Sequence, residues 1–225
     1  MRAATANSES DDAGMEIVGK YMDASRTQAE TLRGGHMEVD IDAKLPALEK
    51  QGKLRALRSI SRLGQITYKA LGFSGDSTIK QEVITRYLAA ETQAQDGGSI
   101  AISPANYKFK LKGRQSLNGR AVELFQITPR HKRIGLFKGE LWLDESTGMP
   151  IREAGQFVKN PSVFLKKVQF VREYEIQDGV AIPKHIESTV DTRIAGRAEI
   201  DINFSNFSKQ DTADAADAVS MSGNQ

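Results

Sequence analysis

The segment LWLDESTGMPIR, residues 141–152, reads as two β-strands joined by a tight turn. A strand at 134–143 leads into it, and the Ser-Thr-Gly sequence at 146–148 is typical of a turn. A second strand at 150–158 follows. Strands joined by so short a connection pair antiparallel, so the segment predicts one hairpin of an antiparallel sheet.

Further strands are expected on both sides of this hairpin. Upstream, apolar residues alternate with lysines at 107–112, and the Asn-Gly pair at 118–119 predicts a hairpin into the next strand. Downstream, the Asp-Gly pair at 178–179 predicts a turn into a strand at 180–191, and apolar residues alternate again at 198–204. Short strands with tight turns predict an antiparallel meander.

The N-terminal half mixes helices with strands. Apolar residues at 15–32 have helical spacing, and the two glycines at 34–35 end that helix. A second helix begins at Asp76 or Ser77 and is ended by the polar segment 95–98. Strands are expected at 37–42, 54–62 and 65–73, with 45–52 as a short helix or a loop.

These patterns predict an α+β fold. A long meander has to curl or close to limit its edges, and amphipathic helices need an apolar surface to cover. We therefore expect a strongly curved antiparallel β-sheet, a half-barrel, with at least two helices covering its concave face. Residues 1–13 and 209–225 are too polar to pack, so both are expected to be disordered on either side of a single domain at 14–208.

The order of several motifs resembles the LolA-like superfamily. The motifs are YKFKLKG at 107–113, VELF at 122–125, GELW at 139–142, the segment 141–152, and GVAIP at 179–183. The resemblance implies a half-open antiparallel barrel with helices as a lid over an apolar cavity. Its members include periplasmic carriers that sort lipoproteins to the outer membrane, and related sensors of lipid or lipoprotein.

Part of the chain departs from the carrier pattern. Residues 45–95 do not match it, which leaves the role of this region open. The resemblance implies an arginine that faces the cavity, and Arg58 and Arg62 are the two candidates.

Sequence features of an enzyme are missing. The chain has no GxSxG elbow, Walker loop or dinucleotide-binding glycine motif. Cysteine is absent, which excludes disulfides, cysteine zinc sites and thiol chemistry. His36, His131 and His185 lie far apart on separate expected strands or loops, and we interpret them as ordinary surface or turn residues. We expect a non-catalytic protein without a metal or other cofactor.

Basic residues concentrate in one region of a chain whose net charge is only +2. Residues 106–138 carry nine Lys or Arg against a single acid, Glu123. This region is either a solubilising outer face or a contact with anionic membrane lipids or an acidic partner. Nucleic acid is not expected as a partner, because alternation points the aromatic residues at 107 and 109 away from the lysines. The candidates for a basic face are Lys108, Lys110, Lys112 and Arg114.

A set of apolar and aromatic residues is the candidate lining of the ligand cavity. Alternation places them on one face of the sheet, under the helices that contain Tyr21 and Tyr87. They either line a cavity or form plain core. The candidates are Tyr107, Phe109, Leu111, Leu141, Leu143, Phe170 and Tyr174.

The function expected from the sequence is binding of lipid acyl chains or lipoproteins, in outer-membrane lipoprotein sorting. The alternative is a regulatory or scaffold protein of the same fold that binds a protein partner. No stretch approaches the roughly 20 apolar residues of a spanning helix, and the first residues lack the apolar core of a signal peptide. We expect a periplasmic location with the signal peptide removed, or alternatively a cytoplasmic one.

Overall fold

The computed structural model describes residues 2–93, 100–160, 165–193 and 196–209, except the side chains of 2–13 and 93. Its helical segments are α1 (Arg2–Leu32), the one-turn η1 (Pro46–Leu48), the short π-helical η2 (Ile79–Ile84) and α2 (Thr85–Gln93). Its strands are β1 (Gly35–Leu45), β2 (Lys50–Ile60), β3 (Ile66–Gly75), β4 (Tyr107–Leu117), β5 (Arg120–Pro129), β6 (Phe137–Asp144), β7 (Pro150–Phe157), β8 (Leu165–Gln177), β9 (Val180–Thr192) and β10 (Arg197–Lys209).

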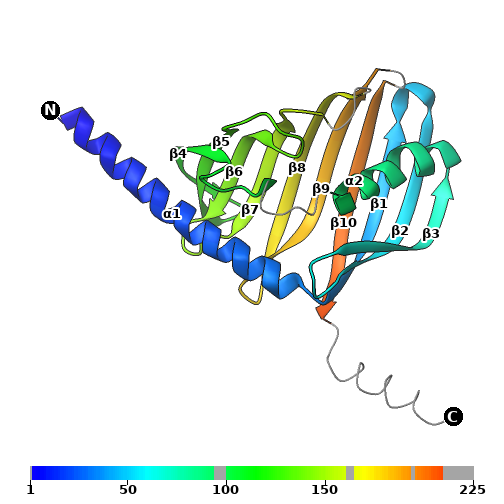
Figure 1. Ribbon diagram of the computed structural model, residues 1–225, viewed down its shortest axis with the longest axis horizontal. Coiled ribbons are helices and arrows are strands. Elements are labelled where there is room, and N and C mark those ends of the chain that lie inside the picture. The colour runs from blue at the N-terminus through cyan, green and yellow to red at the C-terminus, as the bar shows by residue number, and fades with distance from the viewer. Residues whose placement is uncertain (1, 94–99, 161–164, 194–195, 210–225) are drawn as a thin grey trace, which may run out of the picture.

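All ten strands of the described residues form one open, curved sheet (Figure 1). The order is β3-β2-β1-β10-β9-β8-β7-β6-β5-β4, so β3 and β4 are the edges. Consecutive strands pair with each other except β3 and β4, which form the two edges. The pairing of β1 with β10 joins the N-terminal and C-terminal strands. Adjacent strands run antiparallel, which confirms the predicted α+β class and antiparallel sheet.

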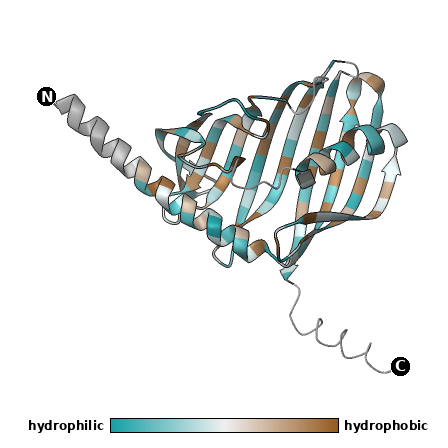
Figure 2. Ribbon diagram, in the orientation of Figure 1, coloured by the Kyte–Doolittle hydropathy of each residue, from teal (hydrophilic) through white to brown (hydrophobic). Residues whose placement is uncertain are grey.

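Both helices pack on the same side of the sheet, which we call the helix face. Ile41 on β1 pairs with Ile202 on β10, and Ile202 pairs with Ile186 on β9, so their side chains share this face. On the opposite side, the bare face, Asp42 pairs with Asp201 and Asp201 with Glu187. The strands accordingly alternate between polar and apolar residues along their length (Figure 2).

The helix face carries two apolar clusters. Cluster one lies where η2 covers β1, β2 and β10, with Ile41, Ile79, Ile84 and Ile202 at its centre. Cluster two lies where α1 covers β4 to β8. Each fully buried Leu, Ile or Phe contributes about 1.5–3 kcal/mol relative to an exposed one, so these two clusters hold the helices on the sheet. A smaller cluster of Val122, Leu124 and Trp142 lies on the bare face.

Two predicted turns have the expected geometry. Asn118 and Gly119 have φ values of 53° and 77°, and Asp178 and Gly179 have 49° and 76°. Both pairs thus adopt the left-handed conformation that a type I′ hairpin requires. Gly155 serves a different need, because a Cβ there would collide with the ring of Phe137 on the neighbouring strand.

The element boundaries differ from the sequence-based ones mainly in the N-terminal half. Helix α1 begins at Arg2, well before the predicted start at residue 15, and β2 begins at Lys50 instead of 54. Asp76 accepts a hydrogen bond from the Thr78 backbone at 2.7 Å, as a helix cap would. The predicted helix end at 95–98 and most of the predicted tail at 209–225 lie outside the described residues. Neither described helix has the length and hydropathy needed to span a bilayer.

Candidate ligand-binding face

All seven predicted cavity residues have side chains on the helix face. Tyr107, Leu141 and Leu143 are fully buried there, and Phe170 is nearly so. Phe109 and Leu111 are only partly buried against cluster two. Tyr174 lies outside this cluster and donates a hydrogen bond to Glu153. The structure therefore brings the predicted set together, mostly as packed core, with α1 contributing Ile17, Val18 and Tyr21.

Aromatic rings link the strands beneath α1. Phe137 lies 5.9 Å from Tyr107 and 4.8 Å from Phe170, centroid to centroid, and Phe170 lies 5.2 Å from Phe157. Edge and tilted contacts of this kind add to the stabilisation from apolar burial. The Tyr107 hydroxyl accepts a hydrogen bond from the Phe137 backbone, and burial raises the pKa of Tyr107 to about 12. This hydroxyl stays neutral at physiological pH.

A charged group lies within the sheet beside these rings. Glu153 on β7 pairs with Arg172 on β8 at 3.4 Å and accepts the Tyr174 hydroxyl at 3.1 Å. Burial, followed by the nearby Glu153 carboxylate, raises the pKa of Tyr21 on α1 and of Tyr174. Burial acts to lower the pKa of Arg172, but Glu153, Tyr174, Tyr87 and Glu91 together outweigh it and the net shift is upward. Arg172 therefore stays charged while Tyr21 and Tyr174 stay neutral.

A second charged group connects α2 to the sheet. Arg58 on β2 contacts Glu91 on α2 at 3.2 Å and the Tyr68 hydroxyl on β3 at 3.2 Å. Tyr68 donates to the other Glu91 oxygen at 2.5 Å. Only 7% of Arg58 is exposed, and its guanidinium also approaches the Met37 sulfur at 4.0 Å. We call Arg58, Tyr68 and Glu91 the α2 latch.

The two arginines that the sequence left open lie in different surroundings. Arg58 faces the helix face, where the resemblance expects an arginine, whereas Arg62 is exposed in the turn between β2 and β3. Tyr68 and Glu91 were missed, because nothing in the sequence indicates that positions so far apart converge on one guanidinium. Burial and the Glu91 charge raise the pKa of Tyr87 to about 12, with Arg172 and Arg58 acting in the opposite direction. The two charged groups thus lie near enough to interact.

Apolar side chains around both clusters remain partly accessible. Around cluster one these are Tyr68, Phe73, Tyr87, Leu88, Ile186, Val190, Phe204 and Phe207. Around cluster two they are Met22, Ile100, Ile102, Phe109, Leu111, Phe157 and Val158. The helices therefore cover the apolar face incompletely, and displacement of a helix would extend the accessible apolar surface.

The predicted basic face is divided by a β-bulge. Lys108, Lys110 and Lys112 are exposed, as alternation predicts. The register shifts between Leu111 and Gly113, and Arg114 then pairs with Glu123 on β5. Arg114 also forms an ion pair with Glu145. A bulge reverses the alternation beyond it, so Arg114 is held by acids and does not belong with the three lysines.

Comparisons with known proteins found similarities to solved structures. No family model and no curated protein matches the chain. A DUF1329 family protein from Desulfovibrio piger is 13% identical with a TM-score of 0.48, over 87% of this chain and 93% of that one. An outer membrane lipoprotein-sorting protein domain from Vibrio parahaemolyticus is 14% identical with a TM-score of 0.47, over 92% and 98%.

A LolA superfamily protein from Nitrosomonas europaea is 15% identical with a TM-score of 0.40, over 90% of this chain and 96% of that chain. With TM-scores below 0.5, these structures assign no ligand, partner or role to this chain.

Proposed function

We propose that this protein binds a lipid acyl chain or a lipidated protein reversibly on its helix face, without catalysing a reaction. The observation that carries the proposal is the incomplete cover of a large apolar face by two separate helices, one of which is latched to the sheet through a buried arginine. In this view the curved sheet acts as a half-barrel and the helices as its lid. Outer-membrane lipoprotein sorting in the periplasm is the process that we assign to it.

The energetics suit a carrier that must also release its ligand. Moving an acyl chain from water to an apolar face is worth about 0.8 kcal/mol per buried methylene. Opening the lid costs part of that gain, because α2 must leave the latch and η2 must expose Ile79, Val83 and Ile84. The net affinity for the ligand is therefore lower than the length of its acyl chain alone would give. A lower affinity permits transfer of the ligand to an acceptor that binds it more tightly.

We extend the proposal to contact with an anionic membrane surface. The β5–β6 loop carries exposed Lys132 and Arg133 beside Ile134, of which 50% is exposed. Residues 126–139, 154–160 and 165–172 on β5 to β8 and their connections contain no acid. A basic surface with an apolar side chain at its centre favours the interface of an anionic bilayer. Lys132→Gln with Arg133→Gln is expected to weaken sedimentation with anionic vesicles at low salt, whereas Lys69→Gln on β3 is not.

The main experiment combines native mass spectrometry with a fluorescent fatty-acid probe. We expect co-purified lipid in the native mass and saturable probe binding that Phe109→Ala weakens severalfold, since Phe109 is a partly exposed residue of the helix face. Leu71→Ala on the exposed edge strand is the matched control. A clean mass together with no probe binding would contradict the proposal.

A protein partner is the second candidate. The observation that favours it is the close packing of the helix face, where Tyr107, Leu141 and Leu143 have no exposed surface. If the native mass is free of lipid and the protein forms a stable complex with another periplasmic protein, the regulatory role replaces the carrier role.

A further inference from the structure

The bare face holds a group of side chains with the chemistry of a metal site. His185 and Glu187 are two residues apart on β9, so both point away from the helices. Asp201 on β10 pairs directly with Glu187. One ligand atom from each of these three side chains lies within 4.8 Å of the others. The site is separate from the helix face and does not depend on its proposed function.

The geometry of the group is suited to a shared cation. His185 Nε2 lies 2.8 Å from Asp201 Oδ2, so the two atoms are close enough to coordinate one ion together. Asn203 donates to the other oxygen of Asp201 at 2.8 Å, which orients the carboxylate toward His185. Outer hydrogen bonds of this kind fix the direction of metal ligands. Glu187 is exposed and free to turn toward the same point.

The surroundings of the group are acidic. Glu173 on β8 pairs with His185 on one side, and Asp42 on β1 pairs with Asp201 on the other. Lys53 compensates Asp42 through an ion pair at 2.6 Å. The carboxylates of Glu173, Glu187 and Asp201 on neighbouring positions favour a bound divalent cation.

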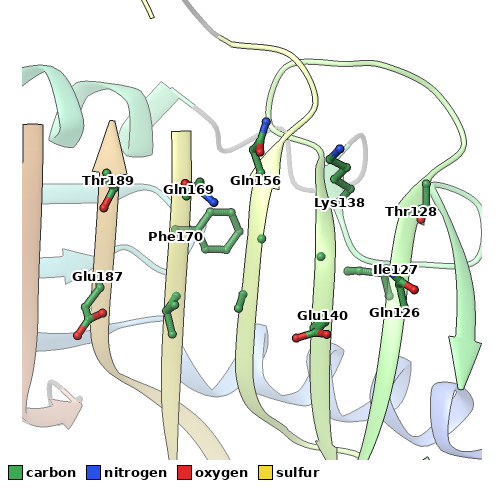
Figure 3. Close-up of a pocket in the computed structure, with 14 residues that line it drawn as sticks. Gln126, Ile127, Thr128, Lys138, Glu140, Gln156, Gln169, Phe170, Glu187 and Thr189 are labelled. Carbon is green, nitrogen blue, oxygen red and sulfur yellow. The ribbon is translucent and has the colours of Figure 1, made fainter. Parts of the chain in front are cut away.

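A hollow adjoins the group and offers room for a further ligand. Its volume is about 650 Å³, and Glu187 forms part of its rim together with Gln169 and Thr189 (Figure 3). Its floor includes the short side chain of Ala154 on β7. A cation at Glu187 would therefore keep coordination positions open toward a solvent-filled space.

We propose that His185, Glu187 and Asp201 form a binding site for one divalent transition-metal ion, with Zn²⁺ as the best match. One imidazole nitrogen and two carboxylates are ligands that Zn²⁺ accepts, with a water or a small anion in the fourth position. Imidazole distinguishes such a site from the all-oxygen sites of Ca²⁺ and Mg²⁺. The ion would join β9 to β10, next to the seam where β10 meets β1.

Zinc titration of the full, chelator-treated chain tests the proposal. We expect one Zn²⁺ per chain by calorimetry and a rise in melting temperature of about 5 °C when Zn²⁺ is about 100-fold above Kd. His185→Gln and Asp201→Asn should each reduce the affinity at least tenfold. His36→Gln is the matched control, because His36 contacts Ser208 at the other end of the sheet.

The outcomes separate a metal site from an ordinary ion pair. A missing 1:1 isotherm, or a melting temperature that Zn²⁺ leaves unchanged, would overturn the proposal and leave His185–Asp201 as a surface ion pair. Binding that survives His185→Gln and Asp201→Asn would overturn it as well. Because each variant is also melted without metal, a loss of fold is distinguished from a loss of zinc affinity.

Discussion

The half of the sheet under α1 and the half under α2 bury their charges in different places. Under α1, Glu153, Arg172 and Tyr174 all come from strands. The helix rests mainly on apolar contacts, with one hydrogen bond from Gln28 to the Ala181 carbonyl on β9. Under α2, one of the three residues of the α2 latch, Glu91, lies on the helix itself. The comparison indicates that α1 is a fixed part of the core, whereas α2 is held by contacts that a ligand or solvent can replace.

The largest expected loss of stability is in the core under α1. Leu141 is fully buried in cluster two, so Leu141→Ala removes buried methyl groups and leaves a cavity. We expect a loss of about 2–5 kcal/mol of unfolding free energy, measured by urea denaturation. Leu71→Ala, at a residue 52% exposed on β3, is expected to stay within about 0.5 kcal/mol. A loss under 1 kcal/mol for Leu141→Ala would mean that the α1 half is loosely packed.

The next effect concerns the β6–β7 turn on which α1 rests. Gly148 in this turn lies so close to Lys20 and the Tyr21 backbone that a Cβ would collide with them. Asp144 holds the turn by accepting hydrogen bonds from Ser146 and Thr147 and by pairing with Arg120 at 3.0 Å. Burial acts against the charge, but these bonds prevail and lower the pKa of Asp144 from 3.8 to about 2.

This shift makes stability depend on pH in a defined window. Because the folded pKa is the lower one, the stabilisation is complete above pH 4 and is lost as the pH falls from about 4 toward 2. It amounts to about 2 kcal/mol. Asp144→Asn should remove it at neutral pH and flatten the unfolding free energy between pH 4 and 2. Equal acid dependence in the variant and the wild type would assign that dependence to other carboxylates.

A smaller effect on stability is expected at the α2 latch. Glu91→Gln keeps the size of the side chain but removes the charge that faces Arg58, at a cost of about 1 kcal/mol. The informative measurement is kinetic: we expect the fatty-acid probe to enter severalfold faster, because α2 opens more readily. Glu82→Gln on the exposed side of η2 is the control. If both variants take up the probe at the wild-type rate, α2 is not the lid.

Local sequence patterns predicted the sheet and its turns. They could not predict which side chains from distant strands and helices meet. Asn118-Gly119 and Asp178-Gly179 specify their turns through backbone sterics, so two residues suffice. Alternation placed Tyr107, Leu141 and Phe170 on one face, because successive side chains of a strand point to opposite sides. The latch needs β2, β3 and α2 to meet, and the metal-site candidate needs β9 beside β10. For His185, the spacing His-x-Glu on a strand was the one available signal.

The bulge in β4 shows where alternation stops being informative. One extra residue between Leu111 and Gly113 turns Arg114 to the other side, toward Glu123 and Glu145. No residue type in this stretch marks the insertion, because glycine at 113 also suits a regular turn or strand end. The sequence therefore predicted that the lysines are exposed. Which basic residues share their face depended on the register between β4 and β5.

The smallest expected effect concerns the first residues of α1. The apolar contacts of this helix with the sheet involve Ile17, Val18 and Tyr21, and Gly14 lies against Leu111 and Phe125. The polar segment ahead of residue 14 has no apolar stripe with which to extend that contact. Deleting residues 2–12 is therefore expected to leave the melting temperature within about 1 °C of the wild type, since helix without packing adds little stability. Deletion through Tyr21 is the matched comparison and should unfold the α1 half. A drop of many degrees for the short deletion would show that the N-terminal segment docks, and the fixed region under α1 would then extend beyond cluster two.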